Sequence, residues 1–414
     1  MNKPDIKKTE LDNGIRIVTD SMPHVRSVSI GIWIKAGSCD ENLDNNGISH
    51  FLEHMLFKGT KSRSVKDIAQ SLEKSGGSLN GFTGREVSCY TAFVLDENVP
   101  VALDVLSDIL QNSILSEKEI RNEKQVIISE INHYRETPDE MVVEYFYEQL
   151  FPNHPLGYAI YGTPENVRKL TSKELRQFLK QKYTAPSTVV AAAGNLDHDR
   201  IVNLVQNKFN LPQTIHENPP FYPSDSNNSA REILSNSSQQ AHICVGTLTF
   251  PYSSEKKYPL IILEILLGGG MSSRLFQNIR EKYGFSYNIY SFSDFMVDTG
   301  VLGFYLACAP DKVEKSLELL HKEFAKVRVN SISTDELNAT KSQIKGSILL
   351  SLESSSRRMR RIGEHEIYDS QLYSVDEIIK KIDETSKDDV IAIAEEYLSS
   401  SQLTTTIIKP NNGN

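Results

Sequence analysis

An order of strands and helices that occurs twice limits the folds open to these 414 residues. Residues 27–38 (SVSIGIWIKAGS) have the apolar, β-branched composition of a strand, and a helical stretch through HFLEHMLF follows them. The next helix (SVKDIAQSLEKSGG) has a capping box formed by Ser64 and Asp67, and Gly76 ends it. In the second half, the strand-like AHICVGTLTF precedes the helical YPLIILEILLGGG. We interpret this shared order as a weak internal duplication.

A polar segment separates the two copies. Residues 211–230 (LPQTIHENPPFYPSDSNNSA) are rich in Pro, Ser and Asn and have no apolar periodicity, which is typical of a linker. The sequence therefore predicts two domains, residues 1–210 and residues 231–414, joined by this linker. Strands followed by helices in each domain indicate an α+β or α/β class, with helices layered on a sheet.

Composition argues against several classes of partner. The net charge is −9, whereas nucleic-acid binding usually requires a basic face. No stretch reaches the roughly 18 uninterrupted apolar residues of a membrane helix, and the first residues lack the apolar run of a secretory signal. The four cysteines are scattered and form no C-x-x-C pair, which favours reduced thiols. We therefore expect a cytoplasmic protein with neither a nucleic-acid nor a membrane partner.

The segment HFLEH has the spacing of a metal site. His50 and His54 are four residues apart, so on a helix they share one face, and Glu53 falls between them in angle. Zinc suits two imidazoles and a third ligand, with its fourth position left for water. An unliganded carboxylate beside that water can take its proton, which is the logic of the H-x-x-E-H motif. The competing interpretation is two helical histidines beside an exposed glutamate.

A third ligand is expected farther along the chain, in residues 117–136 (EKEIRNEKQVIISEINHYRE). Glu123 and Glu130 are seven residues apart, so they project from nearly the same helix face, which also carries the apolar Ile127. Either glutamate is a candidate ligand. The spacing does not choose between them, and ordinary surface ion pairs are an equal alternative.

These features together resemble the pitrilysin, or insulin-degrading enzyme, family of zinc metallopeptidases. In that family H-x-x-E-H is followed by a glutamate about 75 residues later, as it is here. HFLEHMLFKGT, SGGSLNGFT, HPLGYAIYGT and LGGGMSSRLFQNIREKYGFSY also resemble family segments, and the similarity runs from about Leu11 to Tyr397. The most similar branch is the short one, which includes the mitochondrial processing peptidase β subunit and bacterial homologues.

The resemblance implies a role for each residue of the motif. His50, His54 and Glu130 would bind one Zn²⁺ per chain, and Glu53 would be the general base. Glu123 would orient a ligand, since metal-bound histidines are usually held by a carboxylate or carbonyl.

Three residues outside the motif also match family positions. Asn80 matches a residue that contacts the substrate backbone, although an asparagine in a glycine-rich turn is the simpler interpretation without the resemblance. Arg280 and Tyr287 match an Arg and a Tyr that face the tetrahedral intermediate and can donate hydrogen bonds to its oxyanion.

The family architecture implies the α+β class, with two homologous domains that are each an antiparallel sheet with helices packed on one face. Two such chains, or one chain and a homologous partner, would close into a clam-like chamber, and we expect a homodimer. The expected activity is zinc-dependent hydrolysis of internal bonds in short or unfolded peptides. The alternatives are a non-catalytic scaffold or processing-enhancing subunit, and a catalytic subunit that needs a separate glycine-rich partner.

Two further charged segments are expected to have no function. EHE at residues 364–366 lacks the helical spacing of metal ligands. RRMRR at residues 357–361 is most simply a solvated helix face.

Overall fold

The computed structural model describes residues 5–214, 230–236, 238–329, 331–368 and 372–411. Most of the predicted linker, residues 215–229, lies outside these described residues. The chain divides into two compact units that do not coincide with its two halves. The first unit takes residues 350–372 from the second half, and the second unit takes residues 133–153 from the first. Each domain therefore contains a segment that the sequence-based boundaries assign to the other one.

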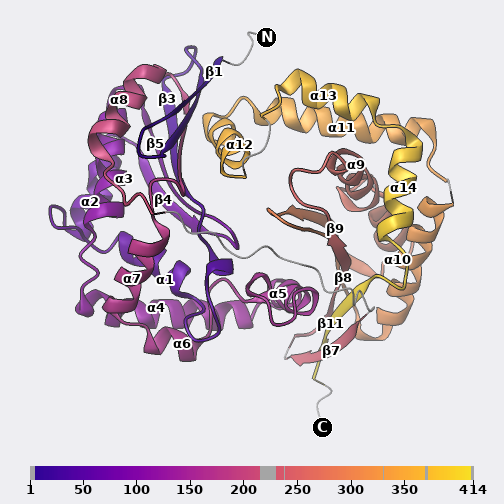
Figure 1. Ribbon diagram of the computed structural model, residues 1–414. Coiled ribbons are helices and arrows are strands. Elements are labelled where there is room, and N and C mark those ends of the chain that lie inside the picture. The colour runs from indigo at the N-terminus through magenta and orange to yellow at the C-terminus, as the bar shows by residue number, and fades with distance from the viewer. Residues whose placement is uncertain (1–4, 215–229, 237, 330, 369–371, 412–414) are drawn as a thin grey trace. The chain divides into compact units, whose positions relative to one another are not determined.

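The first unit is built on a six-stranded sheet with the order β1-β2-β6-β3-β5-β4 (Figure 1). Its neighbours pair antiparallel, apart from the parallel pair of β2 and β6. Strand β4 is therefore an edge strand. The strands are β1 (Asp5–Glu10), β2 (Arg16–Ser21), β3 (Ser27–Ile34), β4 (Ser78–Thr83), β5 (Ser88–Leu95) and β6 (Thr188–Gly194).

Helices from the first half cover one face of this sheet. They are α1 (Ile48–Leu56), α2 (Val65–Glu73), α3 (Val99–Asn112), α4 (Glu117–Arg135), α6 (Pro164–Lys169), α7 (Ser172–Lys182) and α8 (His198–Lys208). Short 3₁₀ turns at Ser38–Asp40, Asp96–Asn98 and Pro155–Gly157 connect them. The predicted capping box of α2 is confirmed, because the Ser64 side chain accepts from the Asp67 amide and the Asp67 carboxylate accepts from the Ser64 amide.

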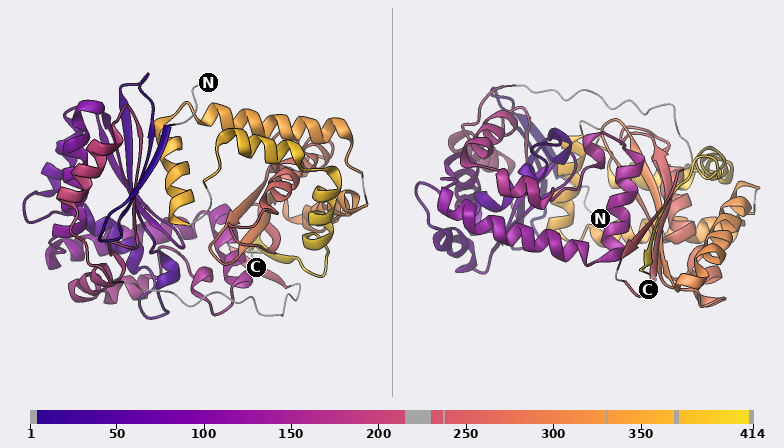
Figure 2. Two further views of the ribbon diagram at one scale, coloured as in Figure 1. Left: turned by 45° about the horizontal axis from the view of Figure 1, so that its top comes forward. Right: turned by 90° about the horizontal axis from the view of Figure 1, so that it is seen from below.

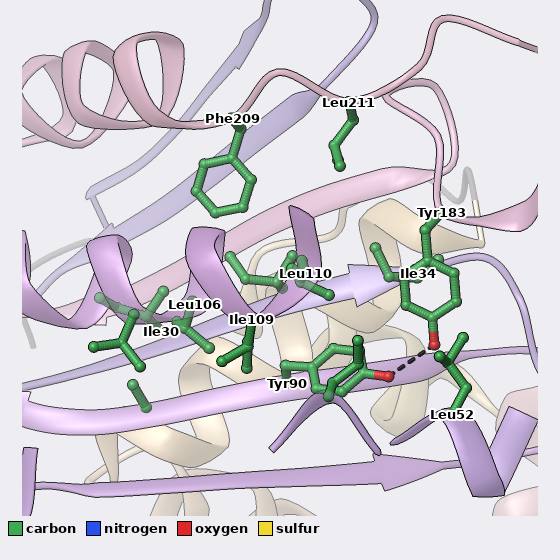
Figure 3. Packing of buried hydrophobic residues seen from close by; sticks show 14 of the residues in the cluster. Ile30, Ile34, Leu52, Tyr90, Leu106, Ile109, Leu110, Tyr183, Phe209 and Leu211 are labelled. Atoms are coloured by element: carbon green, nitrogen blue, oxygen red, sulfur yellow. Dashed lines mark hydrogen bonds between the residues drawn. The ribbon is translucent and has the colours of Figure 1, made fainter. Parts of the chain in front are cut away.

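The core of the first unit lies between this sheet face and these helices. Ile30 and Ile34 of β3 point into it with Leu106 and Leu110 of α3, as alternate strand positions and one helix face require (Figure 3). The buried hydroxyl groups of Tyr90 and Tyr183 form a 2.7 Å hydrogen bond with each other inside this core. Leu52 of α1 belongs to the same cluster, so the metal-motif helix is anchored by the main core.

The other face of this sheet is covered by α12 (Ser355–Ile367), which comes from the second half of the chain (Figures 1 and 2). Gly363 of α12 lies against the indole of Trp33, and the Arg358 guanidinium lies 3.1 Å from the carboxylate of the buried Asp20. The interpretation of RRMRR as a solvated face is therefore wrong for Arg358 and for the buried Met359. It failed because the carboxylate that Arg358 meets lies 338 residues away in the sequence.

The second unit repeats the plan with a five-stranded sheet of order β7-β11-β8-β10-β9. Among the described strands of this sheet, β7 and β11 are the one parallel pair, and β9 is an edge strand as β4 is. The strands are β7 (Arg231–Asn236), β8 (Ala241–Thr249), β9 (Ser286–Phe295), β10 (Gly300–Cys308) and β11 (Thr404–Pro410).

In the second unit, α5 (Pro138–Leu150) packs on β8 and β11, although it comes from the first half of the chain. The remaining helices are α9 (Lys257–Gly268), α10 (Val313–Arg328), α11 (Thr334–Ser351), α13 (Val375–Glu384) and α14 (Lys387–Tyr397), with a π-helix η4 at Phe276–Glu281 and a 3₁₀ turn at Pro310–Lys312. None of the described helices has both the length and the apolar composition needed to cross a membrane.

Candidate metal centre

Helix α1 presents the two motif histidines on one face. It begins after Gly47, whose φ of +97° is a left-handed conformation that favours glycine. Its buried face, which includes Phe51, Leu52, Met55 and Leu56, packs into the core of the first unit. Because the apolar face fixes the rotation of the helix, His50 and His54 lie beside each other, with ring centroids 4.6 Å apart.

Helix α4 brings a carboxylate to these histidines. Glu130 Oε2 lies 3.8 Å from His50 Nε2 and 3.6 Å from His54 Nε2. One ligand atom from each of the three residues lies within 4.8 Å of the others. Two imidazoles and one carboxylate are the donor set of a catalytic zinc site, with one position left open. Among the described residues this is the only group of three or more His, Cys, Asp and Glu side chains that could hold a metal.

The two histidines differ in their proton affinity. Burial, together with the neighbouring His54, lowers the pKa of His50 to about 3, so its ring stays neutral and keeps a lone pair for a metal. Burial alone would lower the pKa of His54, but its hydrogen bond to Glu123 and the nearby Glu130 raise that pKa. A metal at His54 therefore competes with a proton.

Glu123 is hydrogen-bonded to Nδ1 of His54, the ring nitrogen that does not face Glu130. Its Oε1 lies 2.9 Å from His54 Nδ1, and its Oε2 lies 2.7 Å from Lys58 Nζ. Burial would raise the pKa of Glu123, but these two contacts lower it, so the carboxylate is ionised. The structure thus brings Glu130 to the Nε2 atoms and Glu123 to Nδ1, a distinction that the seven-residue spacing had left open.

Glu53 lies beside the histidines and is held by strand β4. Its Oε2 accepts a 2.7 Å hydrogen bond from the Thr83 hydroxyl, and its side chain packs against Gly81, where a Cβ atom would lie only 3.1 Å away. Burial raises the pKa of Glu53, although the Thr83 hydrogen bond opposes this rise. Glu53 is thus a partly desolvated carboxylate with one oxygen anchored, as a proton-accepting group requires.

Asn80 lies on the exposed edge strand β4, so its interpretation as a turn residue is wrong. Its Oδ1 accepts from the amide of the next residue, Gly81.

Arg280 and Tyr287 lie close to each other in the second unit. The Arg280 guanidinium is 5.1 Å from the Tyr287 ring centroid and 4.5 Å from that of Phe276. Arg280 is part of the π-helix, a form that is often found at functional sites. Tyr287 is 78% exposed, so its hydroxyl is free of the core of the second unit.

Sequence reasoning missed three residues around the centre: Glu41, Lys58 and Thr83. Glu41 is buried before the start of α1, where its carboxylate accepts from the backbone amides of Gly47 and Ser49 and from the Asn46 side chain at 2.7–2.8 Å. Burial raises the pKa of Glu41 to about 7, although these hydrogen bonds oppose the rise. Glu41 lies well before Ile48, the first residue of α1, and most of its partners are backbone amides, so no local sequence signal identifies it.

Comparison with known families gives a consistent result. The family described as "Insulinase (Peptidase family M16)" matches residues 16–164, and "Peptidase M16 inactive domain" matches residues 169–344. The first match contains the H-x-x-E-H segment and Glu123 and Glu130 of α4.

Individual relatives extend the similarity to nearly the whole chain. An uncharacterized zinc protease of Bacillus subtilis is 37% identical over 95% of this chain and 96% of its own length. One from Streptomyces coelicolor is 36% identical over 95% of this chain and 87% of its own length. The crystal structure of a protease from Helicobacter pylori shares the fold, with a TM-score of 0.93 at 21% identity over 98% of this chain and 100% of that one. The chain therefore belongs to peptidase family M16, the pitrilysin or insulinase family, as its sequence motifs had predicted.

Proposed function

We propose that this protein is a zinc metallopeptidase that hydrolyses internal bonds of short or unfolded peptides within an enclosed chamber. The observation that carries the proposal is the convergence of His50, His54 and Glu130 within 4.8 Å, with Glu53 beside them. These three residues would hold one Zn²⁺ per chain. The names of the curated relatives, which are zinc proteases, support the same assignment.

The reaction follows from the side chains around the centre. Bound zinc would supply a Lewis acid that polarises the scissile carbonyl and lowers the pKa of water. Glu53 would take the proton of the attacking water at Oε1, because Thr83 occupies Oε2. It would then pass this proton to the leaving amine. Glu123 would keep His54 in the tautomer with Nε2 free for the metal.

Substrate would bind as an extended strand beside β4. An edge strand presents unpaired backbone groups that a peptide can complete by strand addition. Asn80 would then contact the peptide backbone from this strand.

The test of the proposed function is Glu53→Gln. The variant should keep about one zinc per chain and lose peptide cleavage by at least the roughly 10²–10⁴-fold of a general base. Wild-type turnover by this variant would refute the role of Glu53. A wild-type chain that binds zinc and cleaves no peptide, alone or with a glycine-rich partner, would instead indicate a scaffold.

We further propose that the active site is completed within a homodimer, with Arg280 and Tyr287 of one copy facing the zinc of the other. All proposed zinc ligands belong to the first unit, whereas Arg280 and Tyr287 belong to the second, and two-fold pairs are the commonest oligomers.

Mixing Glu53→Gln and Tyr287→Phe chains tests this arrangement, because one of the two sites in each mixed dimer would be intact. Activity should recover toward half of the wild-type value per mixed dimer. If it does not recover although mass spectrometry confirms subunit exchange, the shared site is wrong.

A further inference from the structure

Lys58 makes a contact with the metal centre that the proposed reaction does not use. It lies two residues beyond the end of α1, and its Nζ is 2.7 Å from Glu123 Oε2. The other oxygen of that carboxylate, Oε1, lies 2.9 Å from His54 Nδ1. Both oxygens of one buried carboxylate are therefore committed, one to a lysine and one to the metal-facing histidine.

Burial makes this contact stronger than an ordinary surface ion pair. The Glu123 side chain is only 5% exposed and that of Lys58 is 29% exposed. An exposed pair contributes little to stability, whereas a buried carboxylate that loses its charged partner is strongly destabilised. Without the lysine, Glu123 would keep a single strong partner and could rotate or move toward solvent.

We propose that Lys58 is a positioning residue for the metal centre. It holds Glu123 in the orientation that accepts the Nδ1 hydrogen of His54, and this contact aims His54 Nε2 at Glu130 and the metal. The inference rests on the proposed zinc site. It extends that site from the ligand His54, through Glu123, to Lys58.

When Lys58 is replaced, a positioning role and simple charge repulsion predict opposite changes in zinc affinity. A lysine beside a divalent cation repels it, so removal of the charge alone should leave zinc affinity unchanged or slightly tighter. Removal of the anchor should weaken zinc binding, because loss of an outer partner of a ligand typically costs 10–100-fold in affinity. The direction of the change therefore separates the two effects.

The experiment is a competitive chelator titration of zinc on the full-length protein, with Lys58→Met, Lys58→Arg and the control Lys61→Met. Lys61 is exposed and makes no ion pair among the described residues, so its replacement removes the same charge nearby without removing an anchor. Lys58→Met should weaken zinc binding about tenfold, near the lower end of the outer-partner range because Lys58 acts through Glu123. Lys58→Arg should restore most of the affinity, and Lys61→Met should bind zinc like the wild type.

Unfolding of the zinc-free variants by urea, followed by circular dichroism, separates positioning from general stability. Positioning predicts that the loss of zinc affinity in Lys58→Met exceeds any loss in its zinc-free stability. The inference is overturned if Lys58→Met binds zinc as tightly as the wild type or more tightly, or if Lys61→Met weakens binding equally. A wild-type chain that binds no zinc would instead refute the proposed function itself.

Discussion

Helix α1 of the first unit and helix α9 of the second occupy matching places, each following a central strand and facing an edge strand. When Leu52–Glu53 is aligned with Leu263–Glu264, Ile261 and Ile265 fall where the first unit has its two histidines. Both glutamates accept a hydrogen bond from a hydroxyl of the edge strand. Glu53 accepts from Thr83 at 2.7 Å, and Glu264 accepts from Ser293 at 2.6 Å. Burial raises the pKa of both.

A second pair of helices, α4 and α11, shows the same contrast. Aligning Ile120 and Ile127 of α4 with Leu337 and Ile344 of α11 places Thr340 and Ser347 where the first unit has Glu123 and Glu130. The second unit thus keeps the buried carboxylate but none of the metal ligands. A buried glutamate that is anchored by a hydroxyl is therefore not by itself a sign of catalysis, because the ligands around it decide its role.

The largest expected effect concerns the two carboxylates of α4 that have no counterpart in α11. Glu130→Gln should lose zinc outright, since a direct ligand is removed. Glu123→Gln should weaken zinc binding by about 10–100-fold, as changes to a residue that holds a ligand do. Chelator competition measures both, with Ser347→Ala as the control in the second unit. If Glu123→Gln lost more zinc affinity than Glu130→Gln, the roles of the two glutamates would be reversed.

A smaller effect is expected from the hydroxyls that hold the paired glutamates. Thr83→Val removes a hydrogen bond to a charged group, worth about 1.5–3 kcal/mol, so peptide cleavage should fall by roughly tenfold or more while zinc is retained. Thr83→Ser should keep most of the activity. Ser293→Ala should leave cleavage unchanged and lower only the free energy of unfolding, by about 1 kcal/mol. An equal loss of activity in Ser293→Ala would contradict the distinction between a catalytic Glu53 and a structural Glu264.

The smallest effect is a pH dependence of stability that comes from Glu264. Burial raises the pKa of this carboxyl in the folded state above its unfolded value of about 4.3. Its stabilising contribution is therefore complete below about pH 4.3 and is lost as the pH rises through the folded pKa.

Glu264→Gln cannot lose a proton, so its stability relative to the wild type should improve as the pH rises from about 4 to about 7. Urea unfolding at a series of pH values measures the difference. A stability difference that stays constant over this range would contradict the raised pKa.

The features that the sequence predicted well depend on short-range spacing. The i, i+4 histidines and the Ser64–Asp67 capping box each act within about one helical turn, so the printed order of residues contains their geometry. The repeated order of strands and helices predicted two related α+β domains for the same reason, and the matching fold of family M16 confirms that class.

The features that the sequence did not predict depend on contacts between distant segments. Helix α12 meets the first sheet through pairs such as Arg358 with Asp20, which no local pattern reveals. Spacing gave Glu123 and Glu130 the same helix face, and only their different distances to His54 separate them. The contacts of Glu41 are mostly to backbone amides, which every residue except proline has, so side-chain identity could not reveal them.

Zinc stoichiometry shows whether the metal ligands set the first unit apart from the second. The wild-type chain and a His50→Ile/His54→Ile chain, which gives α1 the isoleucines of α9, would be purified with zinc and analysed by atomic absorption. We expect about one zinc per wild-type chain and none in the double variant, with both chains folded by circular dichroism. Two zinc ions per wild-type chain, or one that persists in the double variant, would contradict it.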